Sequence, residues 1–278
     1  MTIRIWHQSF TVLEQLPAYA EAMAAHFRRV ARPDTEVVMH GMHPSTYRTN
    51  YPGSDIKHSL IQALHANQFV MGGIAAEREG FDVYAIMTLP EPALVECRAL
   101  LDIPVVAYGE SAMLTATMLG RTMGVLMFIG GMEKLIAANC ARMGLSERFI
   151  GAEPVGFGFN DVLAGYSDPV PLIARFIDAA RKMIARGAEV IIPGEAPLCL
   201  LLARSGLNDV DGVPVLDSLA CTIKMAEAMV ELRRTTGVRP CKSGYFGEQP
   251  PRDRIEELLK FYGIADALAI PGSQGNNK

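Results

Sequence analysis

The chain has 278 residues, of which 50% are hydrophobic and 20% are charged, and its formal net charge is −4 at pH 7. This composition is typical of a globular protein, and it provides no basic surface for a nucleic acid partner. No apolar run is long enough to span a membrane, and the five scattered cysteines form no C-x-x-C pair, so we expect a cytoplasmic protein without disulfides or a structural zinc.

Short β-rich runs alternate with longer helical patterns along the chain. The expected strands are 3–6, 35–39, 83–87, 105–108, 123–128, 149–155, 190–192 and 213–216. The main expected helices are 13–30, 59–78, 171–186, 219–233 and 252–262, where apolar residues recur at three- and four-residue spacing. Such alternation is typical of β-α units that build parallel sheets.

An internal repeat indicates two similar halves. The segment 80–83 recurs at 187–190, each time as a glycine that ends a helix and leads into an apolar strand, and 102–106 recurs at 212–216. Repeated β-α units also produce some similarity of this kind without a duplication. We expect an α/β fold of two pseudo-symmetric lobes, each a roughly four-stranded parallel sheet flanked by helices, with the active site in the cleft between the lobes.

The repeat also sets the expected domain boundaries. Residues 1–110 and 218–265 form the first lobe, residues 111–217 form the second, and residues 266–278 form a polar C-terminal tail. In parallel sheets, ligands bind beyond the carboxyl ends of the strands. The segments expected at those ends are His7-Gln8-Ser9, His40-Gly41-Met42-His43, Thr88-Leu89-Pro90-Glu91-Pro92, Gly109-Glu110-Ser111, Ile129-Gly130-Gly131, Gly194-Glu195-Ala196-Pro197 and Asp217-Ser218.

Three motifs at these strand ends resemble one known enzyme family. They are Asp82-Val83-Tyr84-Ala85-Ile86 before Glu91-Pro92-Ala93-Leu94, Asp102-Ile103-Pro104-Val105-Val106 before Gly109-Glu110-Ser111-Ala112-Met113, and Ala188-Glu189-Val190-Ile191-Ile192 before Gly194. As a set they resemble the Asp/Glu/hydantoin racemase superfamily, to which arylmalonate decarboxylase and maleate isomerase also belong. The resemblance implies two pseudo-symmetric lobes, a small-carboxylate or cyclic-amide substrate and, in typical racemases, two cysteines that face each other across the cleft.

The resemblance places those two cysteines at Thr88 and Glu195, and neither position is a cysteine here. A threonine hydroxyl is not a base near neutral pH, whereas a glutamate can be one. A single base suits one-sided proton transfer better than racemisation, so Glu195 is the expected base and Thr88 a hydrogen-bonding partner. Alternatively, Glu195 only caps the helix that opens at Ala196, and Thr88 forms a capping box with Glu91 at a helix near Pro90.

Other residues at the strand ends are candidates for substrate contact. We expect His7 to act as an acid or hydrogen-bond donor in the cleft, since a histidine titrates in a suitable range. The polar and aromatic loop 44–55 is expected to cover the substrate, where Arg48 either pairs with a carboxylate or stays solvated. The remaining candidates are Gln8, Ser9, Tyr47, Glu110 and an anion nest at Gly130-Gly131.

No metal, nicotinamide, flavin or pyridoxal cofactor is expected, because His40 and His43 lack a ligand spacing and Gly130-Gly131 lacks the dinucleotide fingerprint. The leading hypothesis is a cofactor-independent isomerase, racemase or decarboxylase-like enzyme acting on a small carboxylate or carbonyl compound. One alternative is a hydrolase that opens a lactone or cyclic amide, with Glu195 and His7 activating water. Another is a non-catalytic small-molecule binding protein. A homo-oligomer is the expected state.

Overall fold

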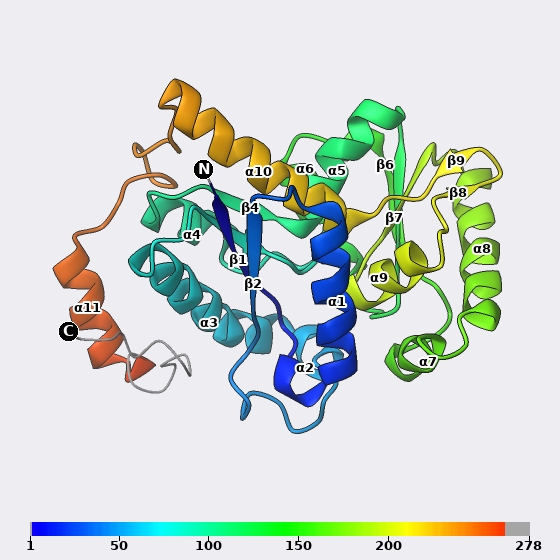
Figure 1. The fold of residues 1–278 in the computed structure, drawn as a ribbon, viewed down its shortest axis with the longest axis horizontal. Helices are drawn as coiled ribbons and strands as arrows, with labels where there is room; N and C mark the ends of the chain where they lie inside the picture. The colour runs from blue at the N-terminus through cyan, green and yellow to red at the C-terminus, as the bar shows by residue number, and fades with distance from the viewer. Residues whose placement is uncertain (1, 265–278) are drawn as a thin grey trace.

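A computed structural model describes residues 2–264 as two parallel sheets surrounded by helices (Figure 1). The first sheet has the order β2-β1-β3-β4 and the second has the order β6-β5-β7, with every pairing parallel. The strands of the first sheet are β1 (Ile3–Gln8), β2 (Thr35–His40), β3 (Val83–Ile86) and β4 (Val105–Ala107). Those of the second are β5 (Met123–Met127), β6 (Phe149–Pro154) and β7 (Val190–Pro193). The expected α/β fold with two parallel sheets is confirmed.

Four of the strands are buried along their whole length because helices cover both faces of each sheet. Every residue of β3, β4, β5 and β7 is buried, which is the pattern expected of parallel strands inside a doubly covered sheet. The edge strand β2 is only partly buried. Continuous apolar runs bounded by turn residues therefore predicted these strands to within two residues at each end.

The second sheet has three strands instead of the expected four. The run expected as a strand at 213–216 instead forms a small antiparallel hairpin, in which β9 (Val213–Pro214) pairs with β8 (Asp209–Val210). Both turn residues, Asp211 and Gly212, have positive φ angles, as a two-residue hairpin requires. Only Val215 extends the parallel sheet, through a single bridge to Ile191.

Helices fill the layers on both sides of the two sheets. They are α1 (Pro17–Val30), α2 (Gly53–Ile56), α3 (Ser59–Arg78), α4 (Leu94–Leu100), α5 (Tyr108–Leu119), α6 (Glu133–Arg142), α7 (Phe159–Gly165), α8 (Val170–Ala185), α9 (Ala196–Arg204), α10 (Ser218–Thr236) and α11 (Arg252–Phe261), with short 3-10 turns at Leu13–Gln15 and Ser146–Arg148. Helix α8 is typical, because its buried residues recur at three- and four-residue spacing. No helix within residues 2–264 has the length and apolar character needed to cross a membrane.

Helix α10 returns the chain from the second sheet to the first. Asp217 caps its N-terminus by accepting the N–H of Ala220, and Gly237 ends it with a φ of 75°. The helix packs against α5, β3 and β4, and it crosses the top of the molecule in Figure 1. The proposed lobe boundaries remain a prediction, and the expected tail 266–278 lies outside the described residues.

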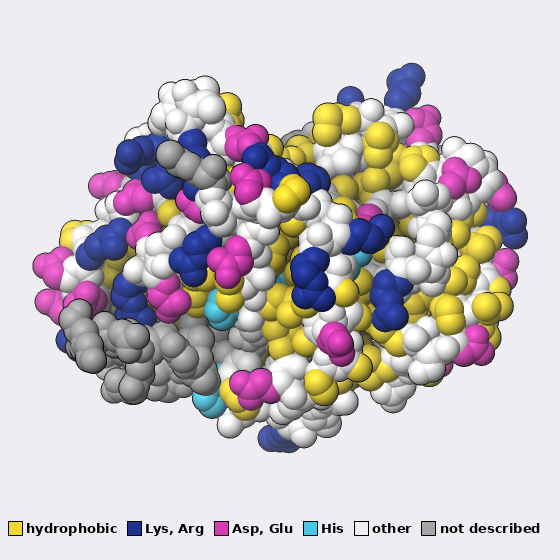
Figure 2. Space-filling view, in the orientation of Figure 1, with side chains coloured by type: hydrophobic (Ala, Val, Ile, Leu, Met, Phe, Trp, Pro, Cys, Tyr) yellow, Lys and Arg dark blue, Asp and Glu magenta, His cyan; other side chains and the backbone are white. Residues whose placement is uncertain are grey.

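Acidic and basic side chains are interspersed over the face shown in Figure 2, and hydrophobic side chains gather between the two lobes and over the second lobe. No field of a single charge sign stands out on this face. The candidate site is a separate feature, defined by residues of both lobes that line one cavity.

Candidate active site

Glu195 follows β7 and its carboxylate turns toward the end of the neighbouring strand β5. Its Oε2 accepts the backbone N–H of Phe128 at 3.0 Å, and its Oε1 accepts that of Ile129 at 2.9 Å. The residue is only 6% exposed. Both carboxylate oxygens therefore hold the first residues after β5, and the carboxylate position is fixed by backbone donors.

The ionisation of Glu195 is set by two opposing effects. Burial raises the pKa of Glu195 to about 7, although the N–H groups of Phe128 and Ile129 favour the charged form and oppose this rise. A carboxylate with a pKa in this range can accept a proton near neutral pH and release it again.

Glu195 is not a helix cap. It occupies the N-cap position of α9, but its side chain makes no hydrogen bond to that helix. Because both oxygens accept N–H groups from the end of β5, neither is directed at the first turn of α9. The alternative in which Glu195 merely caps the following helix is thus wrong.

A small cavity of about 50 Å³ lies between the two lobes, and Thr88 and Glu195 both line it. The first lobe also contributes Ser9 and Tyr51, and the second contributes Phe128. The hydroxyl of Thr88 makes no hydrogen bond to the described part of the protein. The cavity therefore brings together one carboxylate with a raised pKa and one hydroxyl that is available to a bound molecule.

The loop after β2 closes this cavity through an aromatic contact. Tyr51 stacks on Phe159 of α7 with ring centroids 4.9 Å apart and an interplanar angle of 22°. Burial and the nearby Glu195 carboxylate raise the pKa of Tyr51. A volume of about 50 Å³ holds only a few water molecules, so we expect a substrate to enter when the Tyr51 contact opens.

Tyr47 and Arg48 of the loop 44–55 were predicted to contact the substrate, but Tyr51 of that loop lines the cavity instead. Tyr47 is buried against His65, with ring centroids 5.2 Å apart, and Arg48 is exposed. Neither residue lines the cavity, whereas Tyr51 does. The sequence placed Tyr51 in the covering loop, but the direction of its ring follows from the packing on Phe159, which lies in the other lobe.

The three residues at the end of β1 have different environments. Ser9 lines the cavity, and its Oγ accepts the N–H of Thr11 at 3.2 Å. Gln8 is buried and does not line the cavity; its amide donates to the Gly41 carbonyl at 3.0 Å and accepts the indole N–H of Trp6 at 3.1 Å. Ser9 is thus a candidate for substrate contact, and Gln8 supports the loop.

His7 does not line the cavity and faces the helical layer instead. Its ring lies 5.5 Å from that of Phe27 in α1, and its Nδ1 lies 3.2 Å from the His40 carbonyl oxygen. Burial and the neighbouring His40 lower the pKa of His7 to about 3. The imidazole is therefore neutral near pH 7 and does not line the cavity with Glu195, which argues against the predicted role of His7 as an acid or hydrogen-bond donor in the cleft.

The expected anion nest is occupied by carboxylates of the protein itself. Glu195 uses the amides of Phe128 and Ile129, and Glu133 accepts the N–H of Gly131 at 3.0 Å. Gly130 and Gly131 are exposed and do not line the cavity. Glu110 also lies away from the cavity.

Glu91 caps a helix other than the one predicted. Helix α4 begins at Leu94, and Thr88 and Glu91 form no capping box. The Glu91 carboxylate instead accepts the N–H of Glu110 in the first turn of α5 and pairs with Arg142 of α6 at 3.2 Å. Burial raises the pKa of Glu91 to about 7. This carboxylate therefore ties the segment after Thr88 to helices α5 and α6.

No cysteine within residues 2–264 lines the cavity. Cys199 lies one helical turn after Glu195, but it is buried, and its burial raises the pKa of its thiol far above the ordinary value. No three His, Cys, Asp or Glu side chains gather as a metal site within the same residues. The carboxylate of Glu195 is the group in this cavity whose pKa lies near neutral pH.

Comparison with known proteins agrees with this architecture. Hydantoin racemase of Pseudomonas sp. (strain NS671) is 27% identical over 161 residues, which are 58% of this chain and 63% of that protein. Hydantoin racemase of Paenarthrobacter aurescens is 27% identical over 205 residues, 73% of this chain and 85% of that protein. The structure of allantoin racemase from Klebsiella pneumoniae has the same fold, with a TM-score of 0.73 and 21% identity over 90% of this chain and 95% of that one. Residues 17–226 match the Asp/Glu/hydantoin racemase family, and the chain belongs to that family.

Proposed function

We propose that this protein is a cofactor-independent enzyme that transfers a proton at a carbon next to a carbonyl group, with Glu195 as the single base. The observation that carries the proposal is the position of the Glu195 carboxylate, which lines the cavity between the lobes and has a pKa of about 7. A general base is most effective when its pKa lies near the working pH.

Thr88 complements this base. Removing a proton next to a carbonyl moves negative charge onto the carbonyl oxygen, and a hydrogen-bond donor aimed at that oxygen lowers the barrier. The Thr88 hydroxyl lines the same cavity and has no hydrogen bond to the described protein. We assign it the role of donor to the substrate oxygen, while Glu195 removes the proton.

The lining of the cavity favours an uncharged substrate over a carboxylate. No Lys, Arg or His of residues 2–264 lines it, and Phe10, Tyr19 and Phe128 supply aromatic surface. A substrate carboxylate placed beside Glu195 would bring two negative charges together in a poorly solvated space. Because the relatives are named hydantoin and allantoin racemases, uncharged cyclic ureides are the compounds to test first.

The single base also predicts the stereochemical course. Glu195 reaches one face of a planar intermediate, and a threonine hydroxyl does not accept a proton from the other face near neutral pH. The proton therefore returns to the face from which it came. Exchange of the substrate proton with solvent should be faster than inversion of configuration.

The test uses one enantiomer of 5-methylhydantoin, and separately allantoin, in deuterated water with the parent protein and Glu195→Gln. Mass spectrometry measures deuterium at the reacting carbon and chiral chromatography measures inversion. We expect Glu195-dependent deuterium incorporation that outpaces inversion. Exchange that is unchanged in Glu195→Gln, or inversion at each exchange, contradicts the single-base mechanism. Ring opening without exchange identifies a hydrolase, and binding without either reaction identifies a binding protein.

A further inference from the structure

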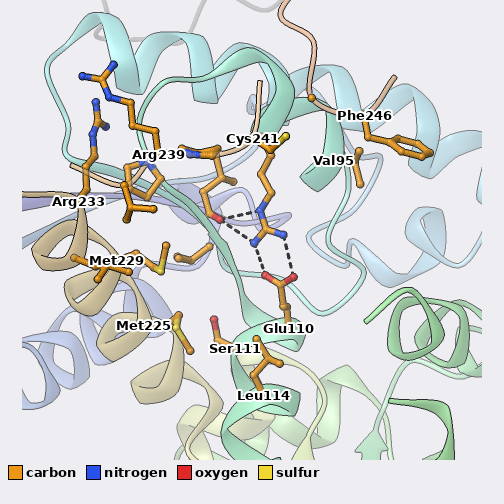
Figure 3. Close-up of a pocket in the computed structure, with 18 of the residues that line it drawn as sticks. Val95, Glu110, Ser111, Leu114, Met225, Met229, Arg233, Arg239, Cys241 and Phe246 are labelled. Carbon is orange, nitrogen blue, oxygen red and sulfur yellow. Dashed lines mark hydrogen bonds and ion pairs between the residues drawn. The ribbon is translucent and has the colours of Figure 1, made fainter. Parts of the chain in front are cut away.

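A second and larger cavity, of about 610 Å³, lies mainly on the first lobe, with Ser111 and Leu114 of α5 in its lining (Figure 3). Its walls come from α4, α5, α10, strand β4 and the segment 238–247 that follows α10. It shares no lining residue with the cavity of Glu195. This volume is within the range of small-molecule sites, so the cavity is large enough for a ligand of its own.

Most of the lining is apolar. Val105 and Val106 belong to β4, the edge strand of the first sheet, while Leu114 comes from α5 and Met225 and Met229 come from α10. Methionine side chains are flexible and polarisable, and they adapt to ligands of irregular shape. The lining therefore suits an extended apolar body.

One polar atom in this lining has no partner. Ser111 is 1% exposed, and its Oγ makes no hydrogen bond in the structure. Figure 3 shows this hydroxyl pointing into the space between Met225 and Glu110. A buried hydroxyl without a partner costs free energy, and a ligand oxygen at this point would provide the missing hydrogen bond.

The charged side chains that line the cavity carry an excess of positive charge. Arg98 is neutralised by Glu110, whose Oε1 lies 2.9 Å from Nη1, and a second contact joins Nη2 to Oε2. Arg233 and Arg239 also line the cavity, and neither has a carboxylate partner within residues 2–264. Figure 3 shows both of them on the side away from Ser111. Two unpaired guanidinium groups favour an anion at this end of the cavity.

We propose that this cavity binds an elongated amphipathic carboxylate, with the carboxylate at Arg233 and Arg239, an apolar body against Met225 and Met229, and a hydrogen-bonding oxygen near Ser111. The assignment follows from the separation of the unpaired cations and the unpaired hydroxyl by apolar wall. An uncharged apolar ligand would leave the arginines unused, and a carboxylate without a second oxygen would leave Ser111 unpaired.

Isothermal titration of the full-length protein with ω-hydroxydecanoate tests this proposal. Decanediol has the same body without the charge, and we expect it to bind at least about 10-fold more weakly. The double variant Arg233→Gln/Arg239→Gln should weaken ω-hydroxydecanoate by a similar factor. Ser111→Ala should lower the affinity for ω-hydroxydecanoate by about 2- to 10-fold and leave that for decanoate unchanged. Leu114 lines the cavity and is partly exposed, so a larger side chain fits there. Leu114→Trp should narrow the cavity and block the binding of ω-hydroxydecanoate and of decanoate.

Cys241 reports where the ligand binds. It lines the cavity and is the exposed cysteine of residues 2–264, and hydrogen bonds with Ser243 lower the pKa of its thiol. Bound ω-hydroxydecanoate should slow its alkylation by iodoacetamide, measured by peptide mass spectrometry, whereas decanediol at the same concentration should not.

Three results would overturn the proposal. One is equal affinity for the charged and uncharged ligands, and another is binding that survives the loss of both arginines. The third is a Cys241 that resists alkylation in the unliganded protein and becomes reactive on dilution, which would mean that a second copy of the chain covers the cavity. None of these readouts depends on Glu195, so the proposed ligand site and the proposed enzymatic activity are tested independently.

Discussion

Tyr51 lies against Phe159 with ring centroids 4.9 Å apart, so a loop of the first lobe closes on a helix of the second. This contact covers the cavity that Thr88 and Glu195 line. Closure of this kind excludes water from the site and strengthens electrostatic interactions inside it. The position of Tyr51 depends in turn on Gly53, which leaves room for the tyrosine ring.

The first prediction concerns that glycine. A Cβ added at Gly53 would lie 2.3 Å from the Tyr51 ring, so Gly53→Ala forces the ring away from Phe159. We expect kcat/KM for the exchange reaction to fall roughly 10- to 100-fold, because misplacement of a covering group disturbs substrate geometry. The melting temperature should change little, since a displaced side chain on a loop buries little extra surface.

Gly158→Ala is the matched control for the Gly53→Ala substitution at the Tyr51–Phe159 contact. Gly158 directly precedes Phe159, has an ordinary negative φ, and an added Cβ there meets no atom within 4 Å. It should retain the parent kcat/KM. If Gly53→Ala and Gly158→Ala had the same activity, the Tyr51 contact would have no part in catalysis.

The second prediction concerns the ionisation of Glu195. The base acts only when it is deprotonated, and its pKa is raised to about 7. The exchange activity, measured as kcat/KM, should therefore be low below pH 6, rise through about pH 7 and level off above it. Glu195→Gln removes the basicity and should lower kcat roughly 10²- to 10⁴-fold at the plateau. A profile that stays flat from pH 5 to 8 in the parent would exclude Glu195 as the base.

The Gln substitution also changes the hydrogen bonds of the site. Both oxygens of the Glu195 carboxylate accept backbone N–H groups, at Phe128 and at Ile129. An amide has one oxygen, so its NH2 group must face one of these donors. Thermal unfolding should accompany the assay, and a variant that keeps the parent melting temperature while losing activity identifies a chemical role.

Much of the fold could be predicted from the sequence because it depends on local patterns. The buried strands appear as apolar runs, and the glycines at 80 and 187 end helices in both halves. The hairpin at Asp211-Gly212 was missed because the valine-rich run after it was assigned to the parallel sheet. The sequence contains that signal, since Asp-Gly is a preferred dipeptide at a two-residue hairpin turn.

The site was harder to predict, because its side-chain directions depend on contacts between residues far apart in the chain. The strand end of Glu195 could be predicted, but not its hydrogen bonds to Phe128 and Ile129, which follow another strand, β5. Similarly, the Thr-x-x-Glu pattern predicts that Glu91 caps its own helix, yet it caps α5. The strand end of His7 predicts that it faces the cleft, although the pleat of β1 turns it toward Phe27.

The third prediction concerns Arg142, which positions the segment that follows Thr88. Arg142 pairs with the buried Glu91 carboxylate, and Asn139 of the same helix donates to the Pro90 carbonyl at 3.2 Å. Arg142→Ala leaves Glu91 with one fewer partner and should reduce stability by about 1–2 kcal/mol, since the arginine itself is partly exposed. Movement of Thr88 should lower kcat by roughly 10-fold with a smaller change in KM.

Two further variants separate positioning from general damage to helix α6. Lys134→Ala removes an exposed cation from the same helix and should leave kcat and stability near the parent values. Arg142→Lys keeps the charge and should restore part of kcat. A loss of stability without any change in kcat would mean that the Glu91–Arg142 pair supports the fold but not the position of Thr88.

The fourth prediction rebuilds the thiol pair that the family resemblance implies at positions 88 and 195. Glu195→Cys alone places one thiol at the end of β7, on the wall of the cavity that position 195 lines. A single thiol still reaches one face of the substrate. We expect this variant to support proton exchange with little inversion.

The double variant Thr88→Cys/Glu195→Cys adds a second thiol to the same cavity, since both positions line it. A thiol has an ordinary pKa of about 8.5 and serves as acid or base, so one cysteine can remove the proton while the other delivers a proton to the opposite face. The ratio of inversion to deuterium exchange, measured on one enantiomer of 5-methylhydantoin, should therefore rise from well below one in the parent toward one in the double variant. Thr88→Ser/Glu195→Cys is the control, because it retains a hydroxyl at position 88 and should keep the low ratio. A parent protein whose ratio already equals that of the double variant would mean that a second base serves the unmodified site, and the mechanism based on Glu195 alone would be wrong.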